Sequence, residues 1–201
     1  RSEIGTVLVP DDAYVEQADD DGRGGLESAV ERLSGLGVRI TRVSIMDDIA
    51  AINEAHQNMI AREFAGIHRY WLEEFSDRYH KRSLQLVERG KGVSDETYRS
   101  ALAGRSTFRE RLDAALHRHG ASLWIAPATV GEAPEGVDAT GNPIMNLPWT
   151  YAGVPTVVLP VYHLPYGRGP AGLPLGIQIA TPFGTDERLI YLASLIEGAF
   201  H

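Results

Sequence analysis

The sequence contains no cysteine. Disulfide bonds and thiolate metal sites are therefore excluded, because both require the cysteine sulfur. A chain without cysteine also fits a reducing compartment, where disulfides do not persist. From this absence we expect a cytoplasmic protein.

An excess of positive charge is also lacking. The chain carries 19 basic and 27 acidic residues, for a net charge of −8, and its only lysines are Lys81 and Lys91. Without a basic stripe to neutralise phosphates, we expect no nucleic-acid partner. The histidines show no metal-binding spacing, since His117 and His119 point about 200° apart on a helix. We therefore expect no metal and no cofactor.

Long apolar runs and an initiator methionine are missing as well. No stretch is long and apolar enough to span a bilayer, and the first residues do not resemble a signal peptide, so no membrane partner is expected. The chain starts at Arg1 and enters a strand-like run almost at once. A cut fragment or a processed chain would begin in this way.

The residues that are present predict a single globular domain over 1–201. Hydrophobic residues make up 43% of the 201 positions, enough for a sizeable core. Only eight charged residues lie at or after Ser122, whereas ten of the eleven prolines lie at or after Pro127. We therefore expect residues 1–121 to be mainly helical with short strands, and residues 122–201 to hold buried strands, shaped loops and a final helix.

Short apolar runs predict the strands. They are Ile4–Val9, Val38–Val43, Leu123–Ala126, Thr156–Val161 and Leu175–Ala180. The Thr156–Val161 run does not alternate, which is typical of a strand buried on both faces. In the last run, Gln178 shares a face with Gly176 and Ala180, so its amide must find hydrogen-bond partners or face a cavity.

Helical spacing of apolar residues predicts the remaining elements. Helices are expected over Leu26–Leu36, from Asp47 to about Phe75, from Ser94 as N-cap to Gly120, and after Thr185 as N-cap. The segment from Asp19 to Gly25, with three aspartates and three glycines, is expected to be a solvated turn or loop. A strand, helix, strand order at the N-terminus predicts a parallel crossover, and the fold class is α/β, a mixed sheet covered by helices.

The C-terminal eighty residues carry three motifs in a recognisable order. They read PATVGEAP, GNPIMNLPWTYAGVP and GLPLGIQIATPFGTDERLI. Together with the upstream GVSDETYRSALAGRSTFRERLDAALHRHG, they resemble the C-terminal half of amidase-signature enzymes. That family includes amidases, allophanate hydrolases and the A subunit of tRNA-dependent amidotransferases. The resemblance implies the C-terminal half of an amidase-signature domain and, for the parent enzyme, hydrolysis of a carboxamide to a carboxylate and ammonia.

The family's catalytic residues are not expected within this chain. Members use a lysine and two serines, with the nucleophile after a Gly/Ser-rich loop in the N-terminal half. No serine here lies in such a loop. The resemblance therefore implies no catalytic residue in these 201 positions, a chain that is inactive alone, and a missing N-terminal half or partner chain. Two alternatives stay open: a non-catalytic binding or interaction module, and one piece of a split amidase.

Five residues are candidates for substrate binding. Ligands gather beyond strand ends in α/β sheets, and the loops there hold Pro127, Thr129, Gly131, Asn146 and Trp149. In one interpretation they shape turns and fill the core. In the other, which the resemblance supports, they wall a cleft for a small-molecule amide, with Asn146 hydrogen-bonding the substrate and Trp149 as an apolar wall. Half a sheet would expose strand edges, so we also expect a homo-oligomer.

Overall fold

A computed structural model describes residues 4–138 and 140–201 of the chain. The described residues group into two compact units. One, here called the sheet unit, contains the described residues up to Ile49 together with Arg109–His201. The other, the helical unit, is Ala50–Phe108. The single-domain interpretation of residues 1–201 stays a prediction.

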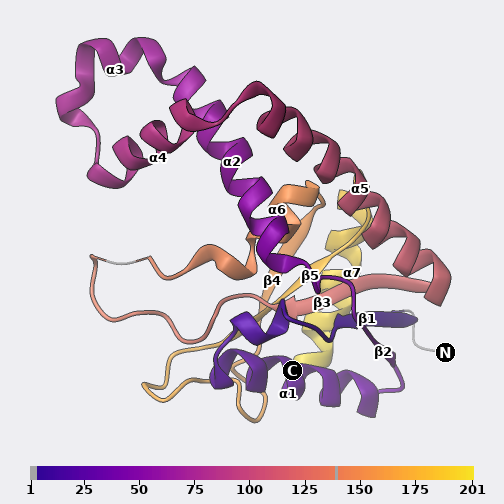
Figure 1. Ribbon diagram of the computed structural model, residues 1–201. Helices are drawn as coiled ribbons and strands as arrows, with labels where there is room; N and C mark the ends of the chain where they lie inside the picture. The colour runs from indigo at the N-terminus through magenta and orange to yellow at the C-terminus, as the bar shows by residue number, and fades with distance from the viewer. Residues whose placement is uncertain (1–3, 139) are drawn as a thin grey trace. The chain divides into compact units, whose positions relative to one another are not determined.

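The sheet unit is built on one mixed sheet (Figure 1). Its spatial order is β2-β1-β3-β5-β4. The central strand β3 runs parallel to β1 and antiparallel to β5; β2 also runs parallel to β1, whereas β4 runs antiparallel to β5. The predicted α/β fold is confirmed, as is the parallel crossover at the N-terminus. The strands are β1 (Thr6–Pro10), β2 (Arg39–Val43), β3 (Ala121–Pro127), β4 (Thr156–Pro160) and β5 (Gly176–Ala180).

Two helices cover one face of this sheet. They are α1 (Asp20–Gly35) and α7 (Asp186–Phe200), which lie against the strands and against each other (Figure 1). Alternate residues of each strand enter the core between these layers. As predicted, Leu175, Ile177 and Ile179 share this face. The apolar residues Leu189, Leu192, Ala193 and Ile196 of α7 are buried.

The start of α1 corrects the predicted turn at Asp19–Gly25. Asp19 is the N-cap, and its carboxylate accepts a hydrogen bond from the Gly22 backbone N–H at 2.8 Å. Two of the three glycines that suggested a turn, Gly22 and Gly25, instead lie in close contact with neighbouring segments. A Cβ on Gly22 would lie 2.3 Å from the Val130 carbonyl oxygen, and a Cβ on Gly25 would lie 3.3 Å from the Leu175 side chain. Gly22 thus lets the helix approach the loop after β3.

Strand β4 corrects a second prediction. The run from Thr156 was expected to be buried on both faces, but β4 is an edge strand of the sheet. Thr156, Val158 and Pro160 are exposed on the face opposite α1 and α7, and Val158 keeps 55% of its surface accessible. β-Branched composition alone does not distinguish an edge strand from a central one, because both positions favour the same backbone.

The helical unit contains four α-helices or parts of α-helices. The chain enters it through α2 (Ile49–Ile67) and leaves through α5 (Asp95–His119); α3 (Arg69–Phe75) and α4 (Lys81–Gly92) lie between. Gly90 brings α4 close to α2, because a Cβ there would lie 2.0 Å from the Ala61 carbonyl oxygen. Ser94 caps α5 as predicted, accepting from the Thr97 N–H at 3.0 Å.

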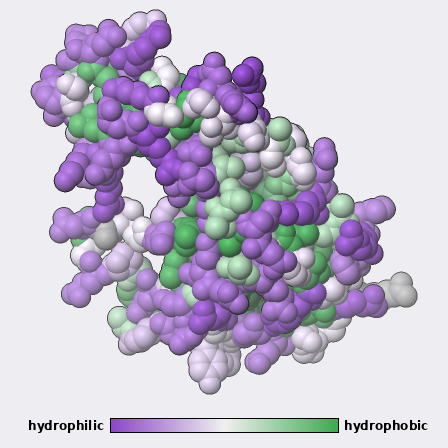
Figure 2. Space-filling model, viewed as in Figure 1, coloured by the Kyte–Doolittle hydropathy of each residue, from purple (hydrophilic) through white to green (hydrophobic). Residues whose placement is uncertain are grey.

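Ion pairs and hydrophilic residues dominate the surface of the helical unit. Arg89 pairs with Glu54 at 2.8 Å, and Arg62 pairs with Asp95. Figure 2 shows mostly hydrophilic residues over α3 and α4. The single helix predicted from Asp47 to about Phe75 is divided into α2 and α3, and Ile67 at the end of α2 and Trp71 in α3 are 66% and 55% exposed. Within residues 4–138 and 140–201, no helix has the length and apolar character needed to cross a membrane.

Candidate functional site

A pocket of about 510 Å³ opens on the face of the sheet unit opposite α1 and α7. This size suits a small ligand. Its floor comes from β4 and the start of β5, and its walls come from the loops that follow β3 and precede α6 (Leu147–Ala152). The described lining residues are Ala128–Pro134, Thr140–Pro143, Asn146, Val158, Pro160 and Pro174–Gly176.

Thr129 and Gly131 shape the first wall of the pocket. The Thr129 hydroxyl donates to the Gly131 carbonyl oxygen at 2.7 Å, which closes a tight turn. The backbone N–H of Asp19 donates to the Val130 carbonyl oxygen at 2.8 Å. A Cβ on Gly131 would lie 2.0 Å from the Asp19 carboxylate, so only glycine fits at this position. The cap of α1 and the pocket loop are therefore one packed structure.

Asn146 lies on the opposite wall, between the short 3₁₀ helix Pro143–Met145 and α6. Its side-chain N–H donates to the Ala128 carbonyl oxygen at 3.3 Å, a long hydrogen bond that ties the two walls together. Thr129, Gly131 and Asn146 thus line the same pocket, as the sequence-based hypothesis requires. Their contact with substrate stays a prediction.

Pro127 and Trp149 are not among the residues that line this pocket. Trp149 is 1% exposed, and its indole N–H donates to the Tyr14 hydroxyl at 2.9 Å. Its ring also packs edge-on against Tyr14, with centroids 5.9 Å apart. Pro127 ends β3, and its carbonyl oxygen accepts a hydrogen bond from Gln178 at 2.8 Å. Their positions favour the core-filling interpretation over the cleft-wall interpretation.

Tyr14 and Gln178 form the centre of a buried polar network beside the pocket. The Gln178 amide N–H group lies within hydrogen-bond distance of the Pro127 and Met145 carbonyl oxygens and the Tyr14 hydroxyl, and that hydroxyl donates to the Met145 carbonyl oxygen at 2.8 Å. The predicted need of Gln178 for partners is confirmed. Burial raises the pKa of Tyr14 above its ordinary value, because a buried phenolate would lose its hydration. No sequence pattern pointed to Tyr14, which lies in an irregular segment after β1.

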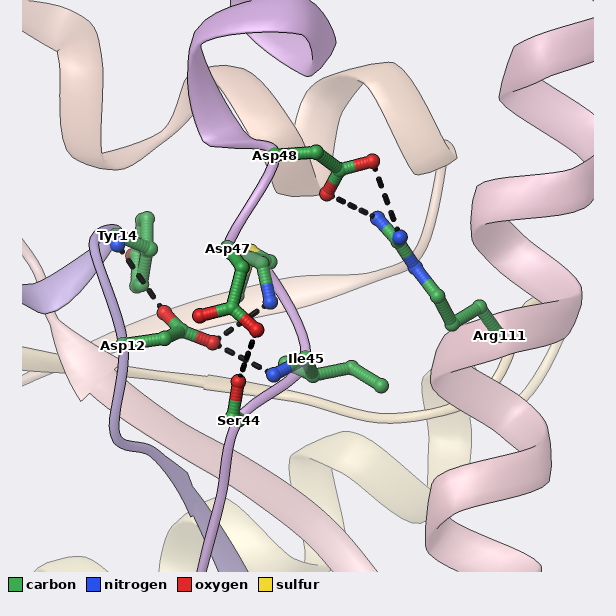
Figure 3. A network of polar contacts seen from close by, with 8 residues as sticks. Asp12, Tyr14, Ser44, Ile45, Asp47, Asp48 and Arg111 are labelled. Carbon is green, nitrogen blue, oxygen red and sulfur yellow. Dashed lines mark hydrogen bonds and ion pairs between the residues drawn. The ribbon is translucent and has the colours of Figure 1, made fainter.

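A second polar cluster lies beyond the ends of β1 and β2 (Figure 3). The Asp12 carboxylate accepts from the backbone N–H groups of Ile45 and Met46, both at 2.6 Å, and from that of Tyr14 at 3.1 Å. Asp48 pairs with Arg111 through two contacts of 2.9 and 3.1 Å. The Asp12 carboxylate is engaged with backbone, so this cluster orders the turn into α2 and positions Tyr14.

The residues that the structure describes contain no group of three or more histidine or acidic side chains arranged to hold a metal ion. Charge is also sparse at the pocket. Among the described lining residues, Glu132 is the single ionisable side chain. The pocket therefore offers backbone groups, two side-chain amides, two threonine hydroxyls and apolar surface rather than a charged ligand cage.

Known proteins share both the sequence pattern and the fold of this chain. The sequence pattern of the family described as Amidase matches residues 4–190, which is most of the chain. The chain belongs to the amidase family. It is also 24% identical, over 226 aligned residues, to the A subunit of the glutamyl-tRNA(Gln) amidotransferase of Syntrophus aciditrophicus (strain SB). That alignment covers 98% of this chain and 45% of the relative.

Solved structures show the same fold. A crystal structure of an amidase superimposes with a TM-score of 0.82 at 22% identity, covering 97% of this chain and 45% of that one. The 6-aminohexanoate cyclic dimer hydrolase in complex with its substrate gives a TM-score of 0.74 at 18% identity, covering 98% and 45%. The chain thus spans less than half the length of these amidase-family relatives, and its sheet corresponds to part of their domain.

Proposed function

We propose that this chain forms the substrate-cleft wall of an amidase that hydrolyses a carboxamide to a carboxylate and ammonia. The observation that carries the proposal is the pocket of about 510 Å³. Three segments that resemble family motifs converge on it: the PATVGEAP loop, the GNPIMN segment and the start of β5. Membership of the amidase family supplies the reaction class.

The catalytic groups are proposed to come from a segment outside these 201 residues. In this scheme a serine attacks the amide carbonyl, a second serine relays its proton to a lysine, and backbone N–H groups stabilise the oxyanion. The chain aligns with 45% of its relatives' length, which leaves room for such a segment in the complete enzyme. The sheet unit would hold the substrate against it.

The lining residues favour neutral carboxamides as substrates. Glu132 brings one carboxylate to the pocket, and no lysine, arginine or histidine is among the described lining residues. A substrate carrying its own carboxylate would meet this negative charge without a compensating cation. Val158, Pro160 and Pro174 offer apolar surface to the remainder of the substrate. Asn146 supplies an amide that can hydrogen-bond the substrate carbonyl or N–H group.

The test of this proposal is the kinetic effect of Asn146→Ala. The substitution is made in an enzyme assembled by joining this chain to the Ser–Ser–Lys half of an amidase relative. We expect kcat/KM for a neutral carboxamide to fall, because a polar group that pairs with substrate is lost. The fall should correspond to a loss of about 1–3 kcal/mol in transition-state stabilisation. The melting temperature should stay within a few degrees of the parent.

A matched control is Thr150→Ala, which removes an exposed polar side chain from the adjoining helix α6. It should change neither kinetics nor stability. If kcat/KM is unchanged in Asn146→Ala while the assembled enzyme is active, Asn146 has only a structural role. That result would contradict the assignment of the pocket as the amide-binding site.

A further inference from the structure

A short hairpin in the β4–β5 connection borders the pocket. This hairpin, here called the flap, is Arg168–Pro174. It is closed internally by the Gly169 N–H donating to the Leu173 carbonyl oxygen and the Gly172 N–H donating to the Gly169 carbonyl oxygen, both at 3.0 Å. Most of its residues are exposed, while Pro174 and the adjoining Leu175 line the pocket. The position of the flap therefore determines one wall.

Glu132 connects the flap to the loop that carries Thr129 and Gly131. One carboxylate oxygen accepts from the Ala171 N–H at 2.9 Å, and the other accepts from the Leu173 N–H at 2.5 Å. Each contact is a hydrogen bond to a charged acceptor, which is stronger than a neutral one. Gly169 makes the approach possible, because a Cβ there would lie 2.6 Å from the Glu132 carboxyl carbon.

The base of the connection is attached elsewhere. Ser28 of α1 donates to the Pro165 carbonyl oxygen, and the Leu175 N–H donates to the Gly167 carbonyl oxygen at 2.9 Å. These contacts lie outside the tip at Gly169–Leu173. Among the side-chain hydrogen bonds of the described residues, those accepted by Glu132 join the tip to the loop that carries Thr129 and Gly131.

We propose that Glu132 is a positioning residue that latches the flap across the pocket and so sets the shape of the substrate wall. The latch itself stands on the contacts above, and only its kinetic consequence rests on the proposed amidase function. Because Glu132 acts through Pro174 and Leu175 rather than on the reacting bond, its loss should weaken substrate binding more than it slows chemistry.

The direct test is backbone hydrogen exchange in the purified 201-residue chain. Glu132→Ala removes both acceptors, so the amides of Ala171 and Leu173 should exchange about tenfold faster or more, while amides in β3 and β5 stay unchanged. Glu132→Gln retains one oxygen acceptor and should give an intermediate acceleration. Gly169→Ala keeps the carboxylate but obstructs its approach, and should accelerate the same two amides.

The matched control is Glu135→Gln, which removes the same charge from an exposed position three residues further along the loop. It should leave flap exchange unchanged. The latch is refuted if Ala171 and Leu173 exchange at parental rates in Glu132→Ala, or if exchange rises equally throughout the sheet unit.

A kinetic measurement separates the latch from the amidase proposal. In the assembled enzyme, Glu132→Gln should raise KM several-fold with a smaller change in kcat. Accelerated flap exchange in an assembled enzyme without amidase activity would retain the latch and reject the proposed function. Accelerated exchange with a fall in kcat alone would contradict the positioning role in substrate binding.

Discussion

Tyr14 brings together, through one hydroxyl, three parts of the chain that are distant in sequence. Its oxygen lies within hydrogen-bond distance of Gln178 on β5 and Trp149 on α6, and it donates to the Met145 carbonyl oxygen. Tyr14 has no exposed surface, so water cannot replace a lost partner. The network fixes α6 and the preceding Asn146 against the sheet, and thereby holds one wall of the pocket.

Tyr14→Phe should lower the free energy of unfolding by about 1–3 kcal/mol, because buried partners lose their hydrogen bonds while the ring remains. The measurement is chemical denaturation of parent and variant. Tyr166→Phe is the matched control: Tyr166 is 80% exposed, so its variant should unfold like the parent. Equal stability of Tyr14→Phe and the parent would show that the network does not stabilise the sheet unit.

At this scale the sequence predicted the need of Gln178 for partners, because an amide among apolar strand residues is conspicuous. It could not identify Tyr14 as a partner, because the two residues are 164 positions apart and Tyr14 lies outside any periodic segment. Trp149 was ambiguous for a related reason. A tryptophan beside a predicted cleft can face ligand or core, and its burial and its hydrogen bond to Tyr14 favour the core.

For several helices and strands, local sequence patterns were sufficient to predict the structure. Alternation predicted which residues of β5 share a face, and the Ser94 cap predicted the start of α5. The patterns failed where tertiary packing determines the residue type. The Gly-rich start of α1 was expected to be a turn, although Gly22 serves the close approach of the helix to Val130. Helix α6 was not predicted, because its six residues are too few to establish a helical period.

Two glycines of α1 provide a test at the scale of the element. Gly22→Ala should destabilise the protein by roughly 1–3 kcal/mol, because the new Cβ would overlap the Val130 carbonyl oxygen. Gly24→Ala, two residues along the same helix, has its nearest neighbour at 3.8 Å, the Tyr166 Cβ. It should stabilise the helix by about 0.5–1 kcal/mol. Thermal unfolding of both variants checks the pair; equal effects would contradict the packing explanation.

At the scale of the whole molecule, the sheet has two edges of different character. Edge strand β2 carries exposed Arg39 and Arg42, charges that discourage further strand pairing. Edge strand β4 instead exposes Val158 beside the pocket. An apolar edge of this kind invites another chain or segment, which is why the homo-oligomer and the missing catalytic half both stay predictions of this account. The order of the motifs predicted the family, whereas composition alone predicted only a globular acidic protein.

The central claim is that this chain supplies the substrate wall and that the Ser–Ser–Lys centre lies outside its 201 residues. The most direct measurement is ammonia release from a panel of neutral carboxamides, by the purified chain alone and by the chain joined to the Ser–Ser–Lys half of an amidase relative. We predict release no faster than buffer from the chain alone, and turnover from the joined enzyme. Turnover by the chain alone that survives repurification, and is lost when one of its own serines is replaced by alanine, would contradict the claim.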